Sequence, residues 1–168
     1  ILNGKVYNID YHQKRLEKSQ HELFGIKSSM ILKNIINIPL PYQQGLVKCR
    51  VVYGQDIDTI TYAHYQYRNI QKLKLVISSE PIDYQHKWVK RPQLDTLYSQ
   101  RSEADEIIIV SEGRITDAFY YNLIFEKQNE LFTPKHPILF GTQRAKLLSQ
   151  GKIIEADIKV DQLSNYQF

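Results

Sequence analysis

Apolar side chains recur at helical spacing near the start of the chain. Leu16, Leu23 and Phe24 lie at such intervals, with Asp10 where an N-cap is expected and Gly25 where a helix can stop. This pattern predicts an amphipathic helix between Asp10 and Gly25.

The flanking segments have the alternation that is typical of strands. Two short β-prone runs surround Asn3-Gly4, a dipeptide that favours a hairpin turn. A second helix is expected over residues 29–36, and it must end before Pro39. Residues 45–68 alternate over two runs, so they predict an antiparallel hairpin.

The second half of the chain mixes the two periods. It predicts a helix over 92–100, a buried strand at 105–110, a turn at 111–116, a hairpin over 122–134 and a helix over 142–151 that ends at its glycine. The polar segment around Pro81 indicates a link between two subdomains, 1–78 and 79–168. The fold class expected is α+β.

Composition and charge narrow the function classes. Of 168 residues, 42% are hydrophobic and 24% charged, as in an ordinary globular protein. The net charge is +4 and the pI about 9.0, but the basic residues are scattered, which argues against nucleic-acid binding. A basic excess of this kind suits an anionic small molecule.

A few residue types exclude further classes. The single cysteine, Cys49, cannot form an internal disulfide or a cysteine zinc site, and it favours a reducing, cytoplasmic location. The five histidines show no metal-ligand spacing, and no apolar run approaches the roughly 18 residues of a membrane helix. Because the chain starts at Ile1 rather than methionine, we expect a short N-terminal piece to precede it.

Short motifs follow one another in a recognisable order. "SEGRITD" comes first, then an asparagine before "LIF", then "FTP", then "FGTQRAKLL"; near the start stands "YHQKRL", and "HKW" occupies residues 86–88. The chain resembles the class IV aminotransferase family, the fold-type IV pyridoxal-phosphate enzymes, over nearly its whole length. This family includes aminodeoxychorismate lyase and the branched-chain and D-amino-acid aminotransferases.

The resemblance implies an architecture and a cofactor. It implies a two-subdomain fold like that of D-amino acid aminotransferase, pyridoxal 5'-phosphate between the subdomains, and a homodimer. Relatives supply a further phosphate-binding threonine from a later strand and loop, before which this chain ends at Phe168. We therefore expect either that this element is absent or that the chain is truncated, and with the missing start the truncation would be at both ends.

Lys87, in "HKWVKR", matches the lysine that binds the cofactor in this family. Its amine would form a Schiff base with pyridoxal phosphate and later move the α-proton of the substrate. Partial burial and the neighbouring cations Lys90 and Arg91 would favour its neutral form. Two alternatives are that Lys90 has this role, or that Lys87 is an ordinary surface lysine.

The resemblance assigns Asp117 to the ring nitrogen of the cofactor, where a carboxylate keeps the ring protonated. The family usually has Glu followed by Gly; this chain has Asp117 followed by Ala118, so the carboxylate is one methylene shorter. The alternative is an aspartate that belongs only to a hairpin turn. A second departure is that Lys90, Arg91 and Pro92 occupy a stretch where some relatives have a tyrosine.

The remaining site residues are cationic side chains and backbone amides. Arg15, in His-x-x-Arg with His12, matches the phosphate-binding arginine, although an exposed helix face would also explain it. The amides of Thr142 and Gln143 would bind phosphate at a helix start. Arg50 matches a strand position where some relatives bind a substrate carboxylate.

The expected function is that of a pyridoxal-phosphate enzyme with a small amino substrate. The contexts of Lys87 and Arg50 favour 4-amino-4-deoxychorismate lyase, which releases pyruvate and 4-aminobenzoate. The alternatives are an amino-acid aminotransferase of the branched-chain or D-amino-acid type, and a catalytically silent binding protein. We expect no nucleic-acid or membrane partner.

Overall fold

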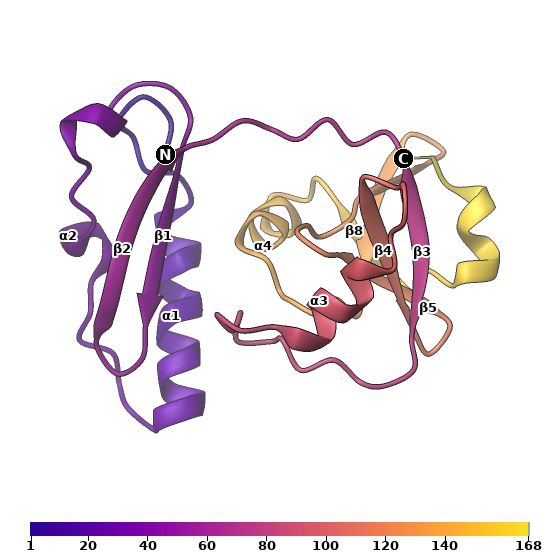
Figure 1. Ribbon diagram of the computed structural model, residues 1–168, viewed down its shortest axis with the longest axis horizontal. Helices are drawn as coiled ribbons and strands as arrows, with labels where there is room; N and C mark the ends of the chain where they lie inside the picture. Colours follow the sequence, from indigo (N-terminus) through magenta and orange to yellow (C-terminus); the bar gives the residue numbers. More distant parts are fainter. Residues whose placement is uncertain (168) are drawn as a thin grey trace. The chain divides into compact units, whose positions relative to one another are not determined.

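The protein divides into two compact units in its computed structural model, in which residues 1–167 are described (Figure 1). Unit 1 is Ile1–Arg68 and unit 2 begins at Asn69. The division precedes the boundary expected after residue 78, because strand β3 (Leu73–Ser78) pairs with a strand of unit 2. Helices and strands occur in both units, which confirms the α+β class.

Unit 1 consists of a long helix, short helical segments and a hairpin. Its elements are α1 (Ile9–Phe24), α2 (Leu32–Ile35), the 3-10 helix η1 (Leu40–Tyr42), β1 (Val47–Tyr53) and β2 (Ile57–His64). β1 and β2 pair antiparallel, as the alternation predicts. The second helix is only four residues long, shorter than the expected range 29–36.

The ends of α1 differ partly from expectation. Its N-cap is Asn8, in the left-handed region at φ 57°, a conformation that asparagine tolerates well, so Asp10 lies inside the first turn. Gly25 ends the helix at φ 66°, as predicted. Leu16 is buried, but Leu23 and Phe24 remain 37% and 42% exposed, so the last turn adds little to the core.

The first residues form a turn rather than a pair of strands. Leu2 and Lys5 make one isolated bridge, and Asn3 and Gly4 between them both have positive φ. The Asn3-Gly4 dipeptide therefore predicts the turn correctly, whereas the β-prone runs on either side are too short to form a strand pair.

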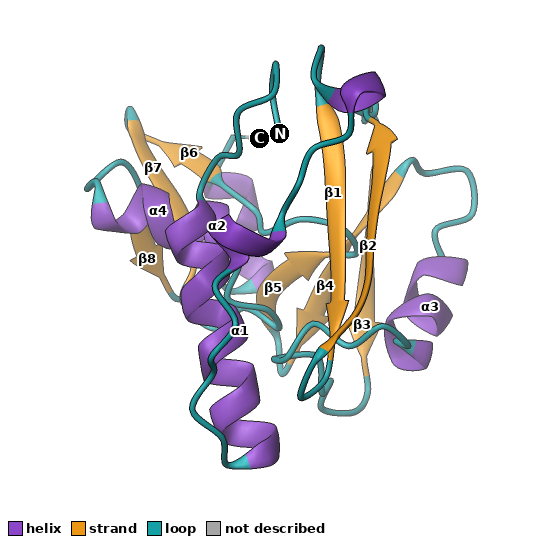
Figure 2. Ribbon diagram, turned by 90° about the vertical axis from the view of Figure 1, so that its left-hand side faces the viewer, coloured by secondary structure: helices purple, strands orange, loops and turns teal. Residues whose placement is uncertain are grey.

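Unit 2 contains two three-stranded sheets. Its further elements are α3 (Pro92–Ser99), β4 (Glu106–Ser111), β5 (Arg114–Ala118), β6 (Phe125–Lys127), β7 (Glu130–Pro134), α4 (Thr142–Ser149), β8 (Ile154–Ala156) and the 3-10 helix η2 (Val160–Asn165). One sheet has the order β3-β4-β5 and the other β6-β7-β8, with β3 parallel to β4 and β7 parallel to β8. α4 lies beside the β6-β7-β8 sheet (Figure 2).

Strand β4 is covered on both faces. Ile107 and Ile109 pack against Leu94 and Leu97 of α3, which crosses the sheet in Figure 1. Ile108 and its neighbours on the other face belong to a second cluster that includes residues of β5 and β6. Successive side chains of a strand point to opposite faces, so a strand buried on both sides reads as a continuous apolar run. No helix among residues 1–167 is long and apolar enough to cross a membrane.

Candidate active site

Lys87 closes a tight turn whose first residue is anchored in the core. Its N–H donates to the Tyr84 carbonyl oxygen at 3.0 Å, and Tyr84 is only 8% exposed. Lys87 has φ 57°, a left-handed conformation that L residues other than glycine adopt rarely and that often marks functional positions. Its side chain is exposed, so the expected partial burial is not observed.

A β-bulge places Asp117. Val110 pairs with Ile115 and Ile108 pairs with Ala118, so β5 contains one residue more than β4 between these two pairs. Such bulges re-aim side chains, and here four consecutive residues from Ile115 to Ala118 are buried. The bulge thus explains how a carboxylate enters an apolar layer.

Hydrogen bonds from Asn122 and from the backbone of Ile138 and Leu139 hold the Asp117 carboxylate. Nδ2 of Asn122 donates to Oδ1 at 2.6 Å, and the N–H of Leu139 donates to Oδ2 at 3.0 Å. The chain turns back between Asp117 and Asn122, where the Ala118 N–H donates to the Tyr121 carbonyl oxygen at 2.9 Å. Asp117 therefore lies on a strand just before the turn, and its hydrogen bonds reach well beyond the turn.

Burial controls the charge of Asp117. The residue is 5% exposed, and loss of water raises its pKa from 3.8 to about 6, although its hydrogen bonds and Arg144 oppose the shift. Within residues 1–167 no lysine, arginine or histidine forms an ion pair with it. A carboxylate has about four acceptor positions, so this one can accept another bond. The site fits a protonated ring nitrogen such as that of pyridoxal phosphate.

The start of α4 is joined to this carboxylate through the backbone. Leu139, which donates to Asp117, precedes Thr142 by three residues, and its carbonyl oxygen accepts from Asn122 Nδ2 at 2.7 Å. Thr142 and Gln143 are the first residues of α4, whose first amides have no intrahelical acceptor. The structure therefore brings two predicted phosphate-binding amides near the predicted ring-nitrogen partner.

Arg144 fixes α4 to the second sheet. It is 5% exposed, and its Nη2 donates to the Pro134 carbonyl oxygen at 2.8 Å and to Glu155 Oε1 at 2.6 Å. The arginine of the "GTQR" motif thus has a structural contact with β7 and β8. Removing it would take away these two contacts of the helix start with the second sheet.

Sequence reasoning missed Asn122 and Gly141 as site residues. A Cβ on Gly141 would overlap Oδ1 of Asn122, so the two residues are in close contact across the site. Asn122 was part of the motif order and Gly141 precedes Thr142 in "FGTQR". The motifs give their positions, but only the folded chain shows the contact.

We expect Gly141→Ala to lower the free energy of unfolding by about 1–3 kcal/mol, the range for buried polar groups that lose their partners. Its φ of −69° suits any residue, so the effect comes from displacing Asn122 and its hydrogen bonds to Asp117 and Leu139. Urea denaturation measures it. Gly54→Ala, where a Cβ meets Phe24 at an ordinary 3.9 Å, is the matched control. Equal stability of both variants would contradict the contact.

The two arginines that the sequence predicts as site residues, Arg15 and Arg50, belong to unit 1. Arg15 lies on α1, partly buried, with Nη2 3.4 Å from Nδ1 of His12. The contact is consistent with His12 orienting Arg15. Arg50 is exposed on β1, opposite Thr61. Lys87, Asp117, Thr142 and Gln143 all belong to unit 2.

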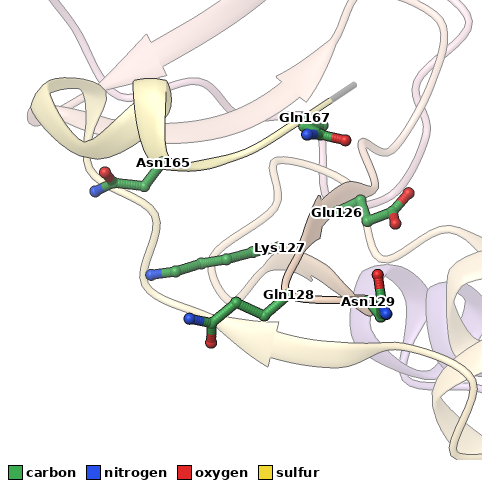
Figure 3. A pocket seen from close by; sticks show the side chains of 6 residues that line it. All are labelled: Glu126, Lys127, Gln128, Asn129, Asn165 and Gln167. Carbon is green, nitrogen blue, oxygen red and sulfur yellow. The ribbon is translucent and has the colours of Figure 1, made fainter.

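A cavity of about 510 Å³ lies elsewhere in unit 2, at the β6–β7 turn (Figure 3). Its lining residues are Glu126, Lys127, Gln128, Asn129, Asn165 and Gln167. Cofactor and substrate pockets are lined mostly by apolar and aromatic groups, so this polar hollow is not our candidate. No cluster of metal-ligating side chains occurs in the described part of the chain.

Comparison with known proteins identifies relatives over the whole chain. The family model for amino-transferase class IV matches residues 1–167. An uncharacterised protein of Haemophilus influenzae is 39% identical over an alignment of 168 positions, which covers 99% of this chain and 89% of that protein.

Solved structures also resemble this chain over nearly its whole length. A crystal structure from Haemophilus somnus 129PT, provisionally described as a 4-amino-4-deoxychorismate lyase, has a TM-score of 0.91 and 36% identity, covering 99% of this chain and 88% of that one. A Mycobacterium tuberculosis protein, described as a hypothetical aminotransferase in its PLP-bound form, is only 14% identical but has a TM-score of 0.74, with 99% and 72% covered. The latter likeness is one of fold.

Proposed function

Because this chain belongs to the class IV aminotransferase family, we propose that it is a pyridoxal-phosphate-dependent enzyme acting on a small amino substrate. The observation that supports this most directly is Asp117. A buried carboxylate that neutral donors hold, with no ion pair in residues 1–167, suits the positive ring nitrogen of the cofactor. An amine on a left-handed turn, at Lys87, supplies the second group that the chemistry needs.

Each residue has a separate task in this proposal. Bound pyridoxal phosphate supplies an electron sink for the bonds around the substrate α-carbon. Lys87 would hold the cofactor through Nζ and would take and return a proton at that atom, while Asp117 would hold the proton of the ring nitrogen in place. The amides of Thr142 and Gln143 would bind the phosphate at the start of α4.

Two arginines of unit 1, Arg15 and Arg50, complete the proposal. Arg15 would bind the phosphate with its planar fork of donors, and Arg50 would bind a carboxylate of the substrate. Both are cations suited to anions, in keeping with the net charge of +4. We also propose that the protein is a homodimer, as the resemblance implies, and that it is cytoplasmic, as its single cysteine favours.

Among the reactions open to such a site, we favour cleavage of 4-amino-4-deoxychorismate to 4-aminobenzoate and pyruvate. The Haemophilus somnus structure, whose provisional description is that of this lyase, supports the choice by its likeness over almost the whole chain. Lys87 would remove a proton from the substrate and return one as pyruvate leaves.

We expect purified protein loaded with pyridoxal phosphate to release one pyruvate for each 4-aminobenzoate formed from aminodeoxychorismate. Pyruvate is measured by coupling to NADH oxidation, and Lys87→Ala is the control. Transfer of the amino group to 2-oxoglutarate, with no pyruvate from aminodeoxychorismate, would instead identify an aminotransferase. If the protein shows neither activity and fails to bind the cofactor, the result would favour a catalytically silent binding protein. The departures from the family pattern at Asp117 and Ala118 are the reason for considering this alternative.

A further inference from the structure

Four planar side chains form a stack in unit 2. Tyr98 and Phe119 stack with ring centroids 4.1 Å apart and planes 11° apart. The guanidinium carbon of Arg91 lies 4.0 Å from the Phe119 centroid, and that of Arg101 lies 4.2 Å from the Tyr98 centroid. Since each ring already has the other against one face, each guanidinium must lie on the opposite face. The order is Arg91, Phe119, Tyr98, Arg101.

The stack joins the two segments that carry the proposed chemistry. Arg91 follows Lys87 by four residues, and Phe119 follows Asp117 by two. Nη1 of Arg91 donates to the Phe119 carbonyl oxygen at 3.4 Å, while the Phe119 N–H donates to Oε1 of the buried Glu106 at 3.3 Å. The backbone just beyond Asp117 is therefore held from two directions, and Arg91 is one of the two.

Stacking, rather than an ion pair, holds Arg91 in place. Its Nε lies 3.7 Å from Oδ1 of Asp95, but Asp95 is 61% exposed, so water screens this pair and it contributes little. On the other side the guanidinium covers Phe119, which is 5% exposed, and lies 5.0 Å from the Tyr120 centroid. A planar, weakly hydrated cation suits these faces, and a lysine ammonium does not reproduce the contact.

We propose that Arg91 is a positioning residue that fixes the Lys87 turn relative to Asp117 through its contact with Phe119. This inference rests on the proposed function, because it assigns Lys87 and Asp117 to opposite ends of one cofactor ring. The two residues are 30 positions apart and on different elements, so their spacing depends on tertiary contacts. An error of about 1 Å at such a site can cost about 100-fold in rate.

The first test uses the protein without cofactor. The Lys87 N–H donates to Tyr84, and its hydrogen exchange, followed by NMR, reports how firmly the turn is held. We expect exchange to be about tenfold faster in Arg91→Gln, the size expected for a partly desolvated cation–aromatic contact. Arg91→Lys keeps the charge but not the plane, so it should resemble Arg91→Gln. Lys90→Gln removes an adjacent exposed charge and should leave exchange unchanged.

The second test uses the loaded protein. We expect both Arg91 variants to shift the pH dependence of the visible absorption of lysine-bound cofactor and to lower kcat by about tenfold or more with KM little changed. Unchanged Lys87 exchange in both variants, or equally fast exchange in Lys90→Gln, would overturn the inference. If the unmodified protein forms no lysine-bound cofactor, the proposed function fails, while the exchange experiment still decides whether Arg91 holds the turn.

Discussion

We expect Lys87→Ala to lose the visible absorption that pyridoxal phosphate gives when it is bound to a lysine amine, and to lose activity by about 10³-fold or more. The size follows from removing the group that carries the cofactor and also moves the proton, since general acid–base catalysis alone is worth about 10²–10⁴-fold. The backbone should not change, because alanine meets the same restriction as lysine at φ 57°. Absorption spectra of the purified proteins, titrated with the cofactor, measure the effect.

Lys90→Ala is the matched control for this experiment. Lys90 lies three residues further along, is also exposed, and is the other lysine that the sequence offers for the role. It should keep both the absorption band and most of the activity. Retention of the band in Lys87→Ala together with its loss in Lys90→Ala would show that Lys90, and not Lys87, carries the cofactor.

The second large effect concerns Asp117 and pH. In the cofactor-free protein the Asp117 pKa of about 6 lies above its unfolded value, so the folded chain binds this proton more tightly. The contribution to stability is therefore full below about pH 4 and is lost as pH rises through 6. It amounts to about 3 kcal/mol, measured as the free energy of unfolding in urea at a series of pH values.

Asp117→Asn should remove this pH dependence and reduce activity by about 10²–10³-fold, the usual effect of deleting one fixed electrostatic partner. Asp117→Glu restores the residue that the family usually has and should keep both the titration and part of the activity. Binding of the cofactor should lower the Asp117 pKa, so stabilisation by pyridoxal phosphate should increase between pH 4 and 6. An identical pH profile for the native protein and Asp117→Asn would show that another group titrates.

Local pattern was enough to predict most elements of the fold. The hairpin of unit 1, the Gly25 stop and the run of apolar residues in β4 each follow from a few neighbouring residues. Local pattern does not give the boundary between the two units. That boundary depends on the parallel pairing of β3 with β4, whose residues are far apart in sequence. Parallel strands need a long connection, and no short turn signal marks them.

The same limit applies to the individual residues of the candidate site. The motif order located Lys87 and Asp117, but not the left-handed backbone of the first or the bulge that buries the second. The contact of Gly141 with Asn122 and the stacking of Arg91 on Phe119 join residues nearly 20 or more positions apart. Such contacts arise from packing, so no periodicity or spacing in the sequence reports them.

The charge of Asp117 has a consequence for how the protein matures. Within residues 1–167 no cationic side chain forms an ion pair with this buried carboxylate, and near neutral pH its ionised form weakens the fold. On the proposed function, the ring nitrogen of the cofactor supplies the missing positive charge, and a ligand that binds only the folded state stabilises it. Cofactor loading would then be a late step of folding as well as a requirement for catalysis. The free energy of unfolding near neutral pH should accordingly rise with the concentration of added pyridoxal phosphate.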